Sequence, residues 1–448
     1  MEDRHAVVTA RSDRGVRDRA AGSTRHVPSQ NATAQGIERL ALGLLSAVAA
    51  PAFIAIAYIR IGSLPFLLSG AVLLAAWLSG AGPLRLRPLD WAVLLVLVYE
   101  VPSLLLSRYP ANGLRTATTV CVAALLYFLV RLVVRSSWQA LLIATLVGVG
   151  GVALAGFALI QFNEQIHLLK ANGLTEIVAF RARLIAPPAP WVLGEWFTLL
   201  LLTLPFAFVV PVFLSLDRRR VLSAGAALLP SIIAAALLLS CSRAVFWGLI
   251  VFAVVAVGTA TVYRTIRTKA ALIAIAGILG ALGLVLATEN LFYPGVMGAY
   301  TGLQTSQVRS TEGRLAIWKR SAGVFRLSPV WGVGSGNAPL FLTSSVDEEE
   351  TTGFASRTFS LPIQVLAEKG AIGAALYLSV LVLAGWEAHR KLRNPKVSLQ
   401  MKGLACCLVA GVAAVLFREL TYSSLLEHAA TAMLFTLCLA LLASEEPA

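Results

Sequence analysis

Long runs of apolar residues, separated by short polar segments, make up most of the sequence from residue 37 onward. Each run is about 20 residues long, the length at which an α-helix crosses a hydrocarbon core of roughly 30 Å. The pattern therefore predicts twelve membrane-spanning helices. Their expected ranges are 37–59, 63–82, 90–107, 116–134, 138–161, 190–216, 221–240, 244–263, 270–288, 364–387, 400–417 and 424–443.

Three segments fall outside these runs. Residues 1–36 are rich in Arg, Ser and Ala and lack an apolar core, which is typical of a disordered basic cytoplasmic tail and not of a signal peptide. The connections 162–189 and 289–360 are long and polar, and no repeat of fixed period is present. We expect an all-α integral membrane protein with a tail at 1–36 and one polytopic membrane domain at 37–448. Its large extracytoplasmic loop, about 289–360, would contain a short amphipathic helix.

The distribution of charge sets the expected orientation. The 448 residues are 58% hydrophobic and 13% charged, which excludes a soluble domain. The net charge of +14 comes from cations between the spans, without the aromatic-interleaved patch that would indicate nucleic-acid binding. With the N-terminus inside, 15 cations lie on cytoplasmic connections and six on short outer ones, as the positive-inside rule requires, so both termini are cytoplasmic. The six outer cations are Arg60, Arg108, Arg115, Arg243, Lys369 and Arg418.

The cysteines and histidines show no metal-ligand spacing. The five cysteines lie in or at the ends of apolar runs, and the five histidines are scattered without an HxxxH or HExxH pattern. We therefore expect no metal ion and no cofactor. Two acids lie inside predicted spans, where a charge is costly and usually faces a cavity or a partner. These are Glu100 and Glu195, of which Glu195 could pair with Arg181 or Arg183.

The stretch STEGRLAIWKRSAGVFRLSPVWGVGSGN, residues 310–337, is the most polar and glycine-rich part of the large loop. Its apolar spacing predicts a short helix with Thr311 as N-cap, which would put Arg314 in the first turn, where an anion could bind. Pro329 and three glycines predict a tight turn after the helix. The local pattern also fits an amphipathic helix on the lipid surface. The apolar face would consist of Leu315, Trp318, Ala322 and Phe325.

The same stretch resembles the signature of the O-antigen ligase and O-antigen polymerase superfamily, in which an Arg–Trp–Ala–Pro series leads into GxGxGN. Three other stretches agree in order and spacing. SCSRAVFWG (240–248) resembles the family's Ser-Arg at the outer end of a span, and RARLIAPPAPW (181–191) resembles its arginine-containing approach to the sixth span. VLAEKGAIGAALYL (365–378) resembles its LxExGxxGxxxY motif. The four stretches cover roughly residues 181–378.

The resemblance implies a multi-pass protein of the bacterial cytoplasmic (inner) membrane. It would be a metal-independent glycosyltransferase that moves an undecaprenyl-diphosphate-linked glycan to a glycan or lipid acceptor, with possible polysaccharide-assembly partners. Ligases of the family carry His-Asn at the positions of Phe359 and Ser360. This departure favours polymerisation of surface or exopolysaccharide repeat units over ligation to a lipid or protein acceptor. A non-catalytic export component and a transporter are alternatives of a different class.

The resemblance also implies functional residues. Arg183, Arg243 and Arg314 would bind the diphosphate, because guanidinium groups stay charged and hold phosphate in bidentate fashion. Arg243, Arg314 and Glu368 would be the catalytic residues. Weaker candidates for substrate binding are Arg181, Trp318, Asn337, Arg357 and Ser360.

Overall fold

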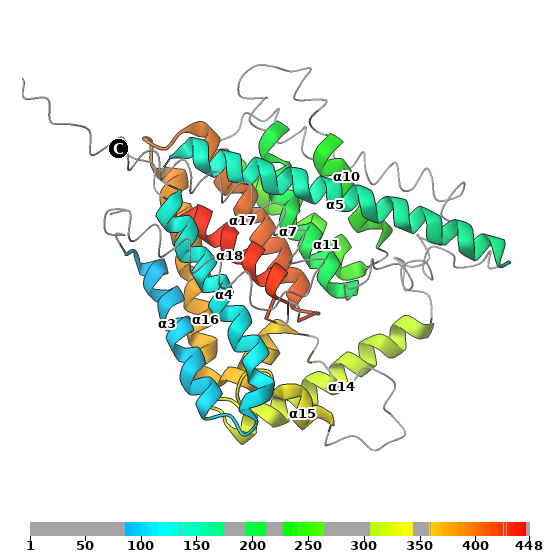
Figure 1. The fold of residues 1–448 in the computed structure, drawn as a ribbon, viewed down its shortest axis with the longest axis vertical. Coiled ribbons are helices and arrows are strands. Elements are labelled where there is room, and N and C mark those ends of the chain that lie inside the picture. The colour runs from blue at the N-terminus through cyan, green and yellow to red at the C-terminus, as the bar shows by residue number, and fades with distance from the viewer. Residues whose placement is uncertain are drawn as a thin grey trace, which may run out of the picture.

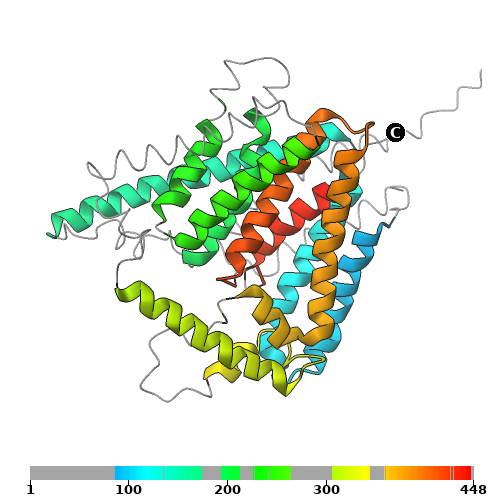
Figure 2. The same cartoon turned by 180° about the vertical axis from the view of Figure 1, so that it is seen from behind.

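The computed structural model describes residues 86–134, 136–173, 193–211, 226, 228–240, 242–263, 305–343, 358, 360–423, 425–426 and 428–444. Every regular element within these ranges is an α-helix (Figures 1 and 2). The predicted tail and the predicted spans at 37–59, 63–82 and 270–288 lie outside them. The helices are α3 (Pro88–Leu105), α4 (Pro110–Val133), α5 (Ser137–Ala171), α7 (Leu193–Ala207), α10 (Leu228–Leu239), α11 (Arg243–Val262), α14 (Thr305–Leu327), α15 (Ala338–Thr343), α16 (Leu361–Arg393), α17 (Leu399–Glu419) and α18 (Ala429–Ala443).

Six of the described helices are long and apolar enough to cross a membrane, namely α3, α4, α5, α11, α16 and α17. The shorter α7, α10 and α18 are also apolar. All of these coincide with predicted spans, so the all-helical membrane fold is confirmed for this part of the chain. The count of twelve spans stays a prediction.

The boundary that differs most from the prediction is the end of α5. The span expected at 138–161 is the beginning of α5, which has 35 residues and runs to Ala171. The segment QFNEQ (161–165) ends the apolar run, but Gln and Glu are good helix formers, so the helix continues beyond its apolar part. The start of the predicted connection 162–189 is therefore helical.

The short helix α7 lies inside the bundle, in contact with α5, α10, α17 and α18. Leu200, Leu201, Leu202 and Leu204 of this helix are fully buried. Small residues on neighbouring helices permit this close packing. A Cβ on Gly411 of α17 would lie 2.5 Å from Pro205 of α7, and one on Gly148 of α5 would lie 2.8 Å from the carbonyl of residue 206.

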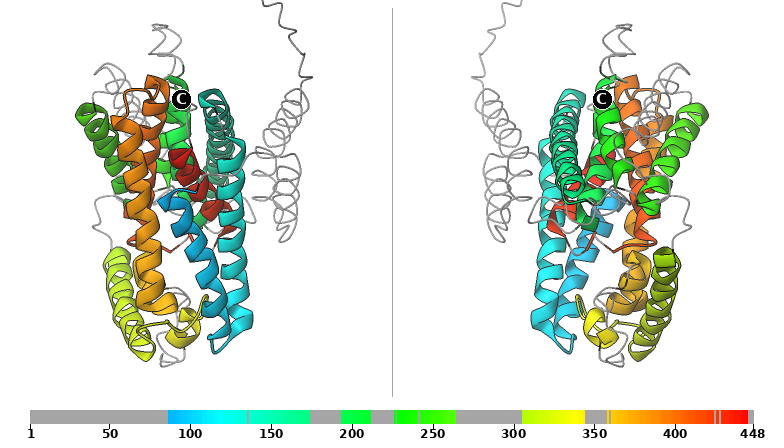
Figure 3. Two further views of the ribbon diagram at one scale, coloured as in Figure 1. Left: turned by 90° about the vertical axis from the view of Figure 1, so that its left-hand side faces the viewer. Right: turned by 90° about the vertical axis from the view of Figure 1, so that its right-hand side faces the viewer.

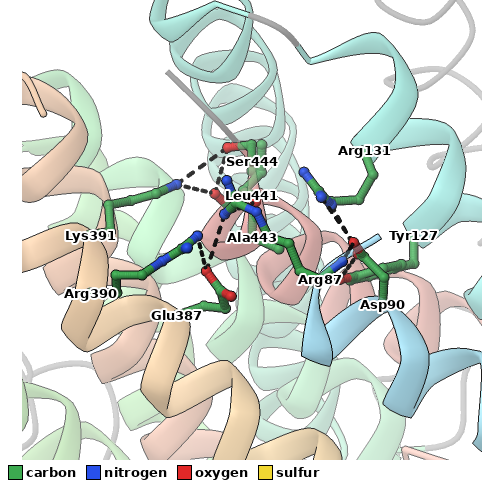
Figure 4. Close-up of polar contacts among 10 residues, drawn as sticks. All are labelled: Arg87, Asp90, Tyr127, Arg131, Glu387, Arg390, Lys391, Leu441, Ala443 and Ser444. Carbon is green, nitrogen blue, oxygen red and sulfur yellow. Dashed lines mark hydrogen bonds and ion pairs between the residues drawn. The ribbon is translucent and has the colours of Figure 1, made fainter. Parts of the chain in front are cut away.

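Buried polar contacts close one end of the bundle, which we call the Arg87 end (Figure 4). Asp90 accepts hydrogen bonds from Arg131 at 3.0 and 2.9 Å and from the Tyr127 hydroxyl at 2.6 Å. Arg87 pairs with Glu387 at 3.1 Å. Further contacts bind the C-terminal carbonyls of α18, where the helix dipole favours cations: Arg87 to Ala443 and Lys391 to Leu441, at 2.9 and 2.8 Å. Cations that the charge pattern assigns to one side of the membrane thus lie at one end of the bundle.

The opposite end, which we call the α14 end, carries α14 and α15. Both helices lie beside the ends of α3, α4 and α16 that are far from the Arg87 end (Figures 1 and 3). Most of the residues implied by the family resemblance and described by the structure belong to this end.

Candidate functional site

The glycine turn, residues 328–337, connects α14 to α15. Gly332, Gly334 and Gly336 have φ angles of 75°, 94° and 69°, a region that residues with a Cβ rarely occupy. Space restricts these positions as well. A Cβ on Gly332 would lie 2.3 Å from the carbonyl of Glu368, and one on Gly334 would lie 2.4 Å from the Cβ of Ser107. The predicted tight turn is confirmed, and its glycines are required by both backbone angle and packing.

The turn packs on α16 where that helix breaks. Gly370 has φ 64° and ψ −166°, which interrupts the helix and frees main-chain groups to bond outside it. The Gly334 amide donates to the Glu368 carbonyl at 2.9 Å, and the Ala371 amide donates to the Pro329 carbonyl at 2.8 Å. Main-chain bonds on both sides of the kink therefore hold the turn.

The carboxylate of Glu368 is fully buried against the same turn. Its Oε2 accepts from the Gly336 amide at 3.0 Å, and its Oε1 accepts from Nε2 of Gln364 at 3.4 Å. A carboxylate held in this way fixes the backbone of the turn. The catalytic role expected for Glu368 stays a prediction, and this geometry favours positioning instead.

Two weaker candidates, Asn337 and Ser360, are also buried. Nδ2 of Asn337 donates to Ser107 Oγ and, at 3.2 Å, to the Val333 carbonyl. Ser360 is the N-cap of α16, and its carbonyl accepts from the Gln364 amide at 2.9 Å. The side chain of Asn337 and the main chain of Ser360 therefore belong to the framework of the site.

Glu100 has a charged partner, as expected for an acid inside a span. Lys369 Nζ lies 2.6 and 2.5 Å from the two carboxylate oxygens of Glu100. The Tyr377 hydroxyl and Ser335 Oγ donate to the same carboxylate at 3.1 and 3.0 Å. Glu100 is 2% exposed and Lys369 0%. The assignment of Lys369 to an outer connection is therefore wrong, because the kink in α16 turns its side chain into the bundle toward α3.

The start of α14 also differs from the prediction. The helix begins at Thr305, so Thr311 is not its N-cap and Arg314 lies in its middle. The argument for an anion site at a helix N-terminus therefore does not apply to Arg314. Its guanidinium, half-buried on α14, remains a candidate for phosphate binding.

The buried face of α14 is not the predicted one. Leu315 is 51% exposed, whereas Ile317, Ser321 and Val324 are buried. Ile317 and Val324 pack in one cluster with Ala367 of α16 and with residues 333, 338 and 342 of the turn and α15. The helix thus packs against protein through this face, and Trp318 beside it is half-buried.

Arg243 is exposed at the first position of α11. A Cβ on Gly248 would lie 3.4 Å from the carbonyl of Ala414, so the beginning of α11 packs against the last two turns of α17. The residues after α17 reach α16, since the Leu361 amide donates to the Tyr422 carbonyl at 3.2 Å. Arg243 therefore lies at the α14 end, as does Arg314.

Another cation at this end, Arg418, is buried and already engaged. Its Nη1 bonds Glu419 Oε1 at 2.8 Å and also Thr198 Oγ1 of α7. Its guanidinium carbon lies 4.5 Å from the ring centroid of Tyr422. Arg418 was predicted on an outer connection, but its charge is neutralised inside the bundle. The adjacent acid in the sequence was the only available signal of this pairing.

The other candidates lie outside the described residues. These are Arg181, Arg183 and Arg357, together with Phe359 and the side chain of Glu195. Among the side chains that the structure does describe, no three His, Cys, Asp or Glu residues are placed to hold a metal ion.

An apolar cavity of about 440 Å³ lies between α3, α4, α16, α17 and α18. Its lining is aliphatic except for Tyr377, Phe435 and Thr436. Leu361 and Leu420 line it near the α14 end. A cavity of this composition suits a hydrocarbon chain and offers almost nothing to a polar ligand.

These features define the class of the protein as a polytopic helical membrane protein, with Arg243, Arg314 and the glycine turn at one end. Residues 226–378, which include Arg243, Arg314, the glycine turn and Glu368, match the family described as O-Antigen ligase. This match supports an O-antigen ligase-like protein and, in general terms, glycan transfer from a lipid-linked donor to an acceptor. Comparison with curated proteins and with solved structures gave no match.

Proposed function

We propose that this protein polymerises undecaprenyl-diphosphate-linked oligosaccharide units at the outer face of the bacterial cytoplasmic membrane. The observation that carries the proposal is the family match over residues 226–378, which contain Arg314 and Arg243. Both arginines lie at the α14 end, away from the cation-rich Arg87 end. The positive-inside rule then assigns the Arg87 end to the cytoplasm and the α14 end to the outer face.

In the proposed reaction, a hydroxyl of the acceptor glycan attacks the anomeric carbon of the donor sugar. The bond between that carbon and the phosphate oxygen breaks, the electron pair leaves with the diphosphate, and the proton of the hydroxyl passes to the departing diphosphate or to water. Arg314 and Arg243 would stabilise this growing negative charge, which is the largest electrostatic demand of the step. A leaving group stabilised in this way lowers the need for a strong base, and we do not assign that role to the buried Glu368.

The polyprenyl tail needs a place within the hydrocarbon layer. We assign it to the apolar cavity between α3, α4, α16, α17 and α18, whose lining reaches the α14 end at Leu361 and Leu420. A chain lying there would bring the diphosphate to the same end as the two arginines. Tyr377, which lines the cavity and donates to Glu100, connects this space to the base of the glycine turn.

Ligation of finished glycan to a separate acceptor is the second candidate, favoured by the family description itself. The two functions leave different intermediates in a strain that lacks the gene. Accumulated lipid-linked single repeat units support polymerisation, and accumulated long lipid-linked chains support ligation. Unchanged lipid-linked intermediates would contradict both.

A further inference from the structure

A buried ion pair joins α3 to α16 directly behind the glycine turn. Nζ of Lys369 lies 2.6 and 2.5 Å from the two carboxylate oxygens of Glu100. The same Nζ also contacts Ser335 Oγ, which donates to Glu100 at 3.0 Å and lies 3.0 Å from Ser103 Oγ. Ser335 is a fully buried residue of the glycine turn. Its hydrogen bonds to both members therefore link the ion pair to the turn.

Lys369 also lies between Glu368, which accepts hydrogen bonds from the turn, and Gly370, which packs closely against it. The carbonyl and the carboxylate of Glu368 accept from the amides of Gly334 and Gly336. On the other side, a Cβ on Gly370 would lie 2.4 Å from the carbonyl of residue 330. The carbonyl of Lys369 accepts from the Tyr99 hydroxyl at 2.7 Å. Thus α3 holds this segment of α16 through both the side chain and the main chain of one residue.

The position of α14 depends on the same turn. The Gly332 amide donates to the Ser328 carbonyl at 2.8 Å, immediately after the helix ends. Ile317 and Val324 pack with Ala367, two residues before Lys369. A shift of the turn or of this part of α16 would therefore move the whole of α14, including Arg314.

We propose that the Glu100–Lys369 pair is a positioning device that fixes α14, and with it Arg314, relative to the bundle. The inference depends on the proposed function only in the role given to Arg314. An apolar pair could also fill this space, and replacing a buried ion pair by apolar residues often preserves stability. A directional pair bonded to Ser335 additionally fixes the register of the turn, which an apolar pair cannot do.

The test compares two double variants in which a buried ion pair is removed completely. The first is Glu100→Met with Lys369→Met, and the matched control is Asp90→Met with Arg131→Met at the Arg87 end. For wild type and both variants, kcat and KM are measured with lipid-linked donor extracted from a strain that lacks the gene. A misplacement of about 1 Å can cost on the order of 100-fold in rate, so we expect a kcat/KM loss of that order for the first variant. We expect the control to stay within about threefold of wild type, because it leaves the contacts of α14 intact.

A second measurement reports the position of α14 and does not depend on the transferase activity of the protein. Spin labels on cysteines placed at the exposed residues Lys319 and Leu114 give the distance between α14 and α4, in a background with the native cysteines replaced. We expect a single narrow distance in wild type and in the control, and a broadened or shifted one in the Glu100/Lys369 variant. Equal distances and equal kcat/KM in all three proteins would overturn the inference.

Two further results distinguish a failure of this inference from misfolding of the variant and from a failure of the proposed function. If the first double variant does not fold, Ser335→Ala is the alternative. This substitution removes the link between the ion pair and the turn without leaving a charge unpaired. We expect it to broaden the distance distribution between α14 and α4 and to lower kcat/KM about tenfold. An unchanged distance in Ser335→Ala would then overturn the inference. A folded wild type that shows no transfer would instead contradict the proposed function, while the spin-label distances would still decide the role of the pair.

Discussion

The glycine turn gives the sharpest prediction about stability, through Gly332→Ala. The added Cβ would lie 2.3 Å from the carbonyl carbon and oxygen of Glu368 and 2.5 Å from the nitrogen of Lys369. These are main-chain atoms of a buried segment and cannot rotate away. The left-handed backbone, with φ 75°, adds a second penalty. About 1–2 kcal/mol for the backbone angle and about 1–3 kcal/mol for overpacking give a destabilisation of about 2–5 kcal/mol.

Gly323→Ala on α14 is the matched control. It makes the same chemical change in the helix that precedes the glycine turn. Gly323 is exposed and helical, and no atom lies within 4 Å of its Cβ position. Alanine should therefore stabilise the helix by up to about 1 kcal/mol. The free energy of unfolding of both variants can be measured by denaturant titration in detergent, alongside the rate of glycan transfer. A Gly332→Ala protein within about 0.5 kcal/mol of wild type and fully active would refute the packing described for the turn.

Three further predictions concern charge and the cavity. Arg314→Ala and Arg243→Ala should each abolish polymer while the protein stays in the membrane. Substitution of the exposed Lys319 on α14 by alanine is the control and should retain polymer. Normal polymer in both arginine variants would reject the site assignment. Arg418→Met should lower the free energy of unfolding by about 3–5 kcal/mol, because it leaves a buried carboxylate unpaired, and an unchanged unfolding curve would contradict that pairing. Ala374→Trp should fill part of the apolar cavity. The KM for a long-chain polyprenyl donor should then rise about tenfold, whereas the KM for a short-chain donor should change little. Equal KM changes for both donors would place the tail elsewhere.

The spans were predictable because a membrane imposes its thickness on the sequence. The apolar runs that predicted spans at 90–107, 244–263 and 400–417 correspond to α3, α11 and α17 within about two residues. The glycine turn was predictable for a similar reason, since few residues other than glycine accept its backbone angles. In both cases a local physical constraint leaves a local pattern.

Long-range packing left no such pattern. The start of α14 was missed because the segment TSQVRS (305–310) has no apolar periodicity, and its buried face was misassigned because the helix packs against its own turn and Ala367. The hydrogen bonds of Lys369 to Glu100 join residues 269 positions apart. The charge pattern placed Lys369 among the cations of the outer connections. Nothing in the sequence shows that α16 is kinked at Gly370 or that the Lys369 side chain bonds Glu100 of α3.

Glycan transfer from a lipid-linked donor, with the diphosphate bound by arginines at the α14 end, can be followed with purified components. The most direct measurement incubates purified protein with the lipid-linked oligosaccharide that accumulates in a strain lacking the gene, and follows the products by mass spectrometry. We expect longer lipid-linked glycan and free undecaprenyl diphosphate with wild type, and unreacted donor with Arg314→Ala. Unreacted donor with folded wild-type protein, or equal turnover by the Arg314→Ala variant, would contradict this proposal.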